Sequence, residues 1–283
     1  MRPSEISARK DLKLETFWRA QKSQLVRDML NTAGHFALSD LGIRIVGEKG
    51  SGKLHLARLI HQYSSRERFS FTHIDCSGLA GSDAEIVLFG SDDPDGMGTG
   101  SGPGLLESAD EGTIYLDVIP ALPAVTQAKL IRALEMRHFR RHGGNQDIHL
   151  NVRVITGHTK RRGPEVPEPT TGPDMPARVS PVCINIPPLR ERREDITPLI
   201  YLFLEEYSAE NGKTVNQITS GAIEVCRYYS WPGNIYELSN VIRHSALRCE
   251  GPTLDAAHLP EYIRQEVDIR DIHRLAEAPD RHR

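Results

Sequence analysis

Apolar positions follow two different spacings along the first two-thirds of the chain, and each spacing predicts a different element. Short apolar or β-branched runs, typical of buried strands, occur at 43–46, 71–74, 113–116, 152–156 and 182–186. Between them lie segments whose apolar residues are three and four positions apart, which is typical of helices, as at 54–63 and 124–135. Strands that alternate with helices in this way indicate an α/β layer with a largely parallel sheet.

The segments before and after this layer have only the helical spacing. Apolar residues between Asp11 and Leu30 predict an amphipathic leader helix. After Pro187-Pro188, the pair Thr197-Pro198 is a good helix start, and helical patterns continue over 199–207, 220–229 and 234–249 with no strand pattern between them. We therefore expect a leader at 1–38, an α/β core at 39–188, a small all-α domain at 189–263 and a charged, frayed tail at 264–283.

Composition narrows the class of protein further. The 283 residues have a net charge of −3, which gives no global electrostatic reason to expect a nucleic-acid binder. The four cysteines form no C-x-x-C pair, so neither a zinc knuckle nor a redox motif is indicated. No apolar run approaches the roughly 18 residues of a membrane span, and the start of the chain lacks a signal-peptide pattern. We expect a cytoplasmic protein with no membrane partner.

A phosphate-binding motif lies directly after the first predicted strand. Its seven residues fit G-x-x-x-x-G-K: Gly47, Glu48, Lys49, Gly50, Ser51, Gly52 and Lys53. In this pattern the glycines let backbone N–H groups surround phosphates, and the lysine neutralises them. The alternative is a structural glycine turn, but the flanking strand and helix favour nucleotide binding. Leu54 departs from the general pattern, in which Ser or Thr supplies a hydroxyl to Mg²⁺.

Five further blocks of sequence, together with this motif, resemble one known family of proteins. They are ESADEGTIYLD at 107–117, QAKLIRAL at 127–134, FRRHGG at 139–144, PPLRERREDI at 187–196 and WPGN at 231–234. From about residue 43 to 262 the chain resembles the AAA+ central domain of sigma-54-dependent transcriptional activators. That resemblance implies a P-loop AAA+ core with a parallel sheet between helices, then an all-α lid. It also implies ATP or ADP with Mg²⁺, ring assembly, and ATP hydrolysis that remodels sigma-54 RNA polymerase. The family tolerates a non-hydroxyl residue at Leu54.

Several positions depart from the family pattern around the site of hydrolysis. Asp117 matches the Walker B aspartate that helps to hold Mg²⁺, but Val118 stands where the family has the glutamate that polarises water. A valine cannot accept a proton, and loss of such a base costs on the order of 10²–10⁴ in rate. The asparagine that restrains the glutamate aligns with Asp75, and the sensor I asparagine aligns with Thr159, which is still polar.

The positions that act on partners have changed as well. The two trans-acting arginines align with Gly172 and Arg178, so only Arg178 remains, and the sensor II arginine aligns with Tyr236. The glycine-rich loop 91–104 replaces the tip that contacts sigma-54 and lacks its Phe-Thr pair, so we do not expect the usual engagement of sigma-54. The loop is either a site for a new partner or an exposed segment without function.

Two further expectations concern the lid region. About twenty residues follow Tyr262, which leaves no room for the helix-turn-helix that normally follows in this family, so no direct DNA-binding domain is expected. The arginines Arg190, Arg192 and Arg193 either make the nucleotide or hinge contacts that the resemblance suggests or form a surface ion-pair cluster with neighbouring acids.

Three hypotheses for function remain open from the sequence. The first, which we favour, is a degenerate AAA+ regulator that binds ATP or ADP through Gly47–Lys53 and Asp117 and hydrolyses it slowly or not at all. It would act on the transcription machinery by self-association or in a mixed ring with a related AAA+ protein, where Arg178 serves a neighbour. The second is a working ATPase in which Asp75 replaces the missing glutamate. The third is an interaction scaffold that no longer binds nucleotide.

Overall fold

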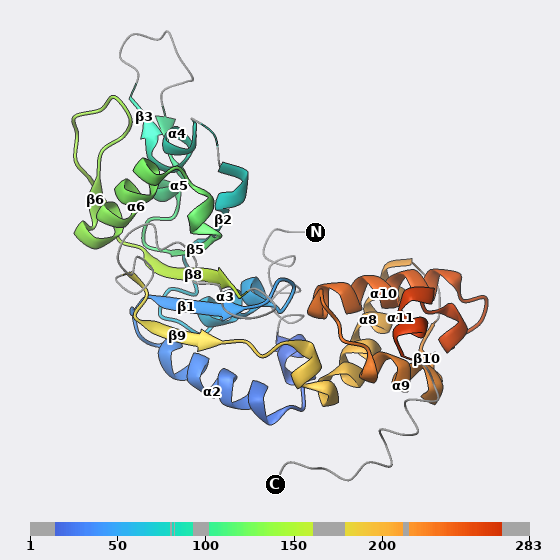
Figure 1. Cartoon of the computed structure of the whole chain (residues 1–283). Helices are drawn as coiled ribbons and strands as arrows, with labels where there is room; N and C mark the ends of the chain where they lie inside the picture. The colour runs from blue at the N-terminus through green and yellow to red at the C-terminus, as the bar shows by residue number, and fades with distance from the viewer. Residues whose placement is uncertain are drawn as a thin grey trace. The chain divides into compact units, whose positions relative to one another are not determined.

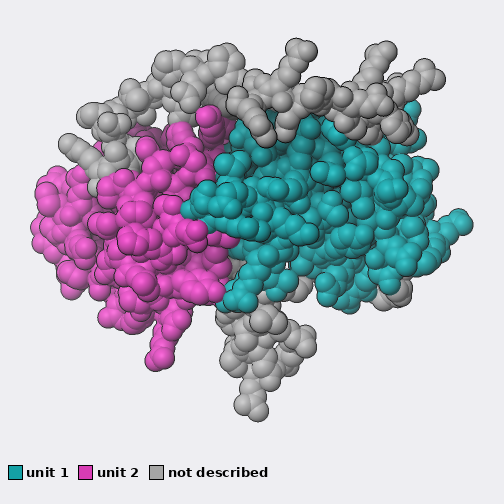
Figure 2. Space-filling model, turned by 90° about the horizontal axis from the view of Figure 1, so that it is seen from below, with its two compact units in different colours: residues 1–28, 48–52, 187–283 teal, residues 29–47, 53–186 magenta. Residues whose placement is uncertain are grey.

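The computed structural model of the chain describes residues 15–79, 81, 83–92, 102–160, 179–211 and 215–267. These residues form two compact units, coloured separately in Figure 2. The sheet unit comprises the described residues within Met29–Gly47 and Lys53–Ile186. The lid unit comprises those within Met1–Asp28, Glu48–Gly52 and Pro187–Arg283.

The sheet unit is built on a five-stranded parallel sheet with the order β2-β5-β8-β1-β9 (Figure 1). The strands are β1 (Ile43–Gly47), β2 (Phe71–Asp75), β5 (Thr113–Asp117), β8 (Arg153–Thr159) and β9 (Val182–Asn185). Each of them overlaps one of the five apolar runs in the sequence. The predicted parallel α/β sheet is therefore confirmed.

Helices and short hairpin pairs surround this sheet. The α-helices are α2 (Gln24–Ala37), whose first turn belongs to the lid unit, α3 (Lys53–Gln62), α4 (Ala84–Phe89), α5 (Leu105–Ser108) and α6 (Ala124–Met136). The 3-10 turns are η1 (Cys76–Leu79) and η2 (Ile119–Ala121). Two antiparallel pairs join β3 (Gly90–Ser91) to β4 (Gly102–Pro103) and β6 (His138–Phe139) to β7 (Ile148–His149). One apolar cluster, which includes Leu88, Phe89 and Leu116, packs α4, α5 and α6 against β2, β5 and β8.

The lid unit is mainly helical, as predicted (Figure 1). Its helices are α8 (Ile196–Asn211), α9 (Ser220–Tyr228), α10 (Asn234–Arg248) and α11 (Glu261–Glu266), with the 3-10 turns η3 (Leu189–Glu191), η4 (Arg193–Asp195) and η5 (Ala256–His258). Trp231 is fully buried, and its indole Nε1 donates to the carbonyl of Cys226 at 2.6 Å. A two-residue parallel pair, β10 (Gln217–Ile218) with β11 (Thr253–Leu254), lies among the helices. The sequence did not predict it, because two-residue strands have no measurable periodicity.

The sequence predicts one continuous leader helix, and this prediction is wrong because the helix is interrupted. Residues 15–19 are helical, the chain leaves the helix at 20–23, and α2 begins at Gln24. The break has a tertiary cause, because the Asp195 carboxylate accepts the backbone N–H groups of Lys22 and Ser23. These N–H groups bind a carboxylate distant in sequence instead of a helix carbonyl, and no local pattern encodes such a partner. The predicted start at 11–14 lies outside the described residues.

Within the described part of the chain, no helix combines the length and the apolar character that crossing a membrane requires.

Candidate nucleotide-binding site

Four of the residues singled out in the sequence stand at or near the carboxyl ends of neighbouring strands. Asp75 ends β2, Asp117 ends β5, Thr159 ends β8, and Gly47 ends β1. The register pairs Asp75 with Asp117 and Gly47 with Thr159. Because all these strands are parallel, their carboxyl ends lie along one edge of the sheet, which is where open α/β sheets bind ligands.

Lys53 places a cation at this edge. It is the first residue of α3 and is buried, and its Nζ donates to the Gly47 carbonyl at 3.3 Å and to Thr159 Oγ1 at 3.0 Å. Burial lowers the pKa of Lys53, while the negative charge of Asp117 acts in the opposite direction. Thr159, which aligns with sensor I, thus holds the P-loop lysine in this structure.

The Asp117 side chain lies above a glycine of the adjacent strand. A Cβ at Gly157 would collide with the Asp117 carboxylate and with the hydroxyl of Tyr115. Burial raises the pKa of Tyr115, and the nearby charge of Asp117 raises it further. Gly157 therefore provides the space in which a half-exposed carboxylate sits beside a phenol that stays neutral.

This carboxylate fits a magnesium site of the kind that a nucleotide completes. Among the described residues, no group of three or more His, Cys, Asp or Glu side chains gathers into a metal-binding cluster. Mg²⁺ does not need such a cluster, because it commonly binds one or two carboxylates together with substrate phosphates and water. Asp117, half-exposed at the edge of the sheet, supplies a ligand of that type.

Val118, which follows Asp117, has an unusual backbone. Its φ of 53° and ψ of 43° lie in the left-handed region, and its N–H donates to Asp117 Oδ1 at 3.1 Å. A β-branched residue rarely adopts this conformation, and it persists only where the surrounding structure imposes it. The side chain is 38% exposed and has no proton-accepting atom.

Asp75 is the nearest alternative carboxylate, and its own turn engages it. Asp75 Oδ1 accepts the Ser77 backbone N–H at 3.0 Å and the Ser77 hydroxyl at 2.6 Å. These two hydrogen bonds hold the pKa of Asp75 below its usual value. They also direct this oxygen towards η1.

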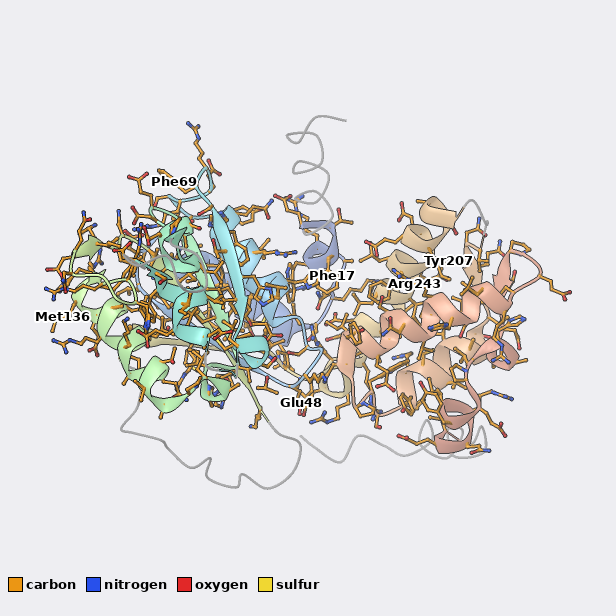
Figure 3. All side chains as sticks on the ribbon, turned by 90° about the horizontal axis from the view of Figure 1, so that it is seen from above. Phe17, Glu48, Phe69, Met136, Tyr207 and Arg243 are labelled. Carbon is orange, nitrogen blue, oxygen red and sulfur yellow. The ribbon has the colours of Figure 1, made fainter. Side chains whose placement is uncertain are left out.

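The loop segment Glu48–Gly52 belongs to the lid unit and makes its contacts there. Glu48, labelled in Figure 3, accepts two hydrogen bonds from Arg190 at 2.6 and 2.8 Å and one from Asn234 Nδ2 at 3.1 Å. The bidentate pairing raises the pKa of Arg190. The expectation of a surface cluster with neighbouring acids is wrong for this arginine, since its partner is the P-loop.

Two residues farther along the same segment, Arg192 and Asp195, are buried. Arg192 donates to Gln21 Oε1 at 2.6 Å and to the Ser51 carbonyl at 3.2 Å, and burial lowers its pKa to about 10. Asp195 is fully buried, which raises its pKa, and it holds the leader at Ser23. Arg193 instead lies over a tyrosine ring of α9. The three arginines therefore have three different environments.

Some of the remaining predicted positions lie among the described residues and others do not. Tyr236 keeps a side chain that is 69% exposed, while its backbone N–H donates to the Gly50 carbonyl at 3.3 Å. Leu54 is half-buried in the first turn of α3. The aligned trans positions Gly172 and Arg178 lie outside the described residues, as does the loop tip 93–101.

The base of that loop is described and is held by ion pairs. Arg141 donates to both oxygens of Glu107, at 2.7 and 2.8 Å, and to Asp92 Oδ1 at 2.8 Å. The Asp92 N–H also donates to the His142 carbonyl at 2.9 Å. The segment 138–149 therefore binds the chain where it leaves β3, at Asp92, and in α5 after β4, at Glu107.

Sequence reasoning gave no role to Asn234 or Gln21. Asn234 belongs to the Trp-Pro-Gly-Asn block, which carried the resemblance, but nothing in its spacing connects it to a loop 180 positions earlier. One local signal was available: the run from Trp231 to Asn234 contains a proline and a glycine, as expected for a turn. Both Trp231 and Asn234 have positive φ there.

Comparisons with known proteins agree with this architecture. A family model described as the sigma-54 interaction domain matches residues 20–185, and one described as an AAA+ ATPase lid domain matches residues 190–274. Regulatory protein AtoC of Escherichia coli (strain K12) is 38% identical over 261 residues, covering 90% of this chain and 56% of AtoC. Transcriptional regulatory protein ZraR of Klebsiella oxytoca is 36% identical over 241 residues, covering 84% and 54%.

Solved structures are similar over the same region. The crystal structure of NtrX from Brucella abortus in complex with ATP has a TM-score of 0.77 at 29% identity, and the match covers 91% of this chain and 60% of that one. The chain spans about half the length of the curated relatives it matches. The parallel sheet, the P-loop, the helical lid and the family match over 20–185 lead to one conclusion: the chain belongs to the sigma-54 interaction domain family of AAA+ proteins.

Proposed function

We propose that this chain is a nucleotide-binding regulator that hydrolyses ATP slowly or not at all. ATP or ADP would bind through Gly47–Lys53, with Asp117 holding Mg²⁺ and Thr159 contacting the outer phosphate. Two observations support this: Lys53 and Asp117 are placed at the ligand-binding edge of the sheet, and the related NtrX was crystallised with ADP and with ATP.

Impaired hydrolysis rests chiefly on Val118. The position after Asp117 carries a side chain that can neither accept a proton nor orient water, and loss of a general base costs on the order of 10²–10⁴ in rate. Asp75 is a poor substitute, because the hydrogen bonds from Ser77 stabilise its ionised form and so make it a weaker base. This observation favours the regulator over an ATPase with Asp75 as base.

Partner-dependent action is the second half of the proposal. The glycine-rich segment 91–104 lacks the Phe-Thr pair, so the chain would act on the transcription machinery through a ring, formed with itself or with a related AAA+ protein. Arg178 would then serve the neighbouring subunit. Sedimentation velocity with and without ATP tests this point: ATP-dependent oligomers support it, and a monomer both alone and with co-purified AAA+ proteins contradicts it.

Nucleotide binding is tested by titrating a fluorescent ADP analogue in the presence of Mg²⁺. Wild-type protein should bind, Lys53→Ala should lose most of the affinity, and Arg132→Ala should bind like wild type. Arg132 is the control because it is an exposed cation of α6, outside the binding loop. Equal, negligible binding by all three would leave only the scaffold hypothesis.

Hydrolysis is tested by steady-state phosphate release from the same proteins. We expect turnover far below about 1 s⁻¹, a common enzyme rate, with Val118→Glu raising it because this substitution restores a carboxylate. Turnover near 1 s⁻¹ in the wild type that collapses in Asp75→Ala would overturn the proposal in favour of a working ATPase.

A further inference from the structure

Donors of the lid unit bind each residue of the loop from Glu48 to Ser51. Arg190 and Asn234 bind the Glu48 carboxylate. The three following carbonyls each accept a different donor: Asn234 Nδ2 at Lys49 (3.1 Å), the Tyr236 N–H at Gly50 (3.3 Å) and Arg192 Nη2 at Ser51 (3.2 Å). Consecutive carbonyls of a loop are thus fixed from one set of elements, η3, the turn after it and the start of α10.

Burial and a hydrogen bond to the backbone hold Asn234 in this position. It is fully buried, its φ is 53°, and its Oδ1 accepts the Leu189 N–H at 2.8 Å. That bond orients the amide so that Nδ2 reaches both Glu48 and the Lys49 carbonyl. Gly50 is equally constrained, because its φ is +74° and a Cβ there would collide with the Gly233 carbonyl. The loop and the turn before α10 therefore fit each other at backbone distance.

Holding the carbonyls also sets the direction of the amides. In a trans peptide the C=O of one residue and the N–H of the next point in opposite directions. Fixing the Lys49 carbonyl therefore turns the Gly50 N–H away from Asn234, and fixing the Ser51 carbonyl turns the Gly52 N–H away from Arg192. The Ser51 N–H donates to the Glu48 carbonyl at 3.2 Å, which closes the turn. The N–H groups of Gly50 and Gly52 are thus directed away from the lid donors, and backbone amides fixed in a loop can together bind an anion.

We propose that Asn234 and Arg192, together with Arg190 acting through Glu48, are positioning residues that preorganise the loop amides for the phosphates of a nucleotide. The lid would then contribute to phosphate affinity through the shape of the loop, although Tyr236 brings no charge to the sensor II position. The inference rests on the proposed nucleotide binding, and it assigns part of the affinity for the nucleotide to these contacts of the lid. Arg192 also donates a hydrogen bond to Gln21, so the leader contacts one of the residues that hold the loop.

The test replaces the central donor without changing its size. Asn234→Asp puts an acceptor where Nδ2 donates and sets a negative charge against Glu48, while an aspartate tolerates the same positive φ. We expect the Kd for pyrophosphate with Mg²⁺, and the Kd for ADP, to rise at least tenfold, because the two hydrogen bonds that Asn234 Nδ2 donates to Glu48 and to the Lys49 carbonyl are lost. Asn240→Asp is the matched control, because it makes the same chemical change in the same helix.

A second variant and a second readout keep the test decisive if Asn234→Asp folds poorly. Arg190→Lys keeps the charge and loses the bidentate geometry, so it should raise both Kd values by a smaller factor at an unchanged melting temperature. Backbone amide exchange at Gly50 and Gly52 in ligand-free protein should be faster in both variants than in Asn240→Asp.

The outcomes separate this inference from the proposed function. If wild-type protein binds neither pyrophosphate nor ADP, the proposed function fails. If wild-type protein binds both, and Asn234→Asp and Arg190→Lys bind them as tightly as Asn240→Asp does, the contacts are structural only and the inference is overturned. This holds even where the melting temperatures of the two variants fall.

Discussion

A single residue, Val118, combines a changed chemistry with a strained backbone. The left-handed conformation costs an ordinary L-residue roughly 1–2 kcal/mol, and a β-branched side chain tolerates it least. The strain persists because Val118 connects Asp117, at the end of β5, to η2, whose Ala121 N–H donates to the Val118 carbonyl. The conformation is thus set by the elements on both sides of Val118 and not by its side chain.

We predict that Val118→Asn stabilises the protein by about 1 kcal/mol, which corresponds to a rise in melting temperature of roughly 2–4 °C. Asparagine tolerates the left-handed region, and little packing is lost because the valine is 38% exposed. Val125→Asn is the control, since Val125 is an exposed valine, at 77%, in the regular helix α6. Thermal unfolding followed by circular dichroism measures both, and equal changes in the two variants would contradict the prediction.

At the scale of elements, the sheet holds the end of a helix with a buried arginine. Arg153, the first residue of β8, donates to the carbonyls of Ala37 at 2.6 Å and Phe36 at 2.7 Å. The last carbonyls of a helix have no partner within it, so a side chain must satisfy them if they are buried. Burial lowers the pKa of Arg153, but an arginine remains charged at neutral pH.

We expect Arg153→Met to destabilise the protein by about 2–4 kcal/mol, because it removes two hydrogen bonds from a charged donor, a kind of bond worth about 1.5–3 kcal/mol. The Phe36 carbonyl still accepts the Ser39 hydroxyl and N–H, so the loss falls mainly on the Ala37 carbonyl. Urea unfolding gives the free energy, and hydrogen exchange over residues 33–37 locates the effect in the last turn of α2. Arg132→Met, at an exposed position of α6, should change stability by less than about 0.5 kcal/mol. Unchanged exchange at 33–37 would show that the arginine does not cap the helix.

For the whole molecule, any ligand that binds only the folded chain must stabilise it. At a ligand concentration one hundred times Kd, the gain is about 2.7 kcal/mol. The size of the effect depends on the ligand concentration and the affinity, so it reports binding without any assumption about hydrolysis.

Saturating ADP with Mg²⁺ should therefore raise the melting temperature of the wild type and of Arg132→Ala, and leave that of Lys53→Ala unchanged. Differential scanning calorimetry at several ADP concentrations measures the effect, which should grow with the logarithm of concentration. A wild-type melting temperature that does not move at millimolar ADP would contradict the proposed function.

The features that local sequence could predict are those that local physics determines. Apolar spacings predicted all five strands of the sheet and three helices of the lid, α8, α9 and α10, because each buried face must recur with the period of its element. The short helix α11 was not predicted. The P-loop was readable from Gly47 to Lys53 because phosphate binding requires glycines and a lysine in one short run. That a valine stands at position 118, where the family resemblance implies a glutamate, also needed only the residue itself.

Contacts between distant segments could be decided only by the tertiary structure. The leader breaks at 20–23 because Asp195 binds its backbone, and Arg190 faces Glu48 rather than its neighbouring acids. Hydrogen-bond partners of this kind are set by which elements pack together, and residues more than a hundred positions apart leave no periodic signal. The sequence by itself thus determined the fold class and the chemistry available at the edge of the sheet. The tertiary structure decided that the lid holds the P-loop carbonyls, because only packing brings Asn234 and Arg192 to them.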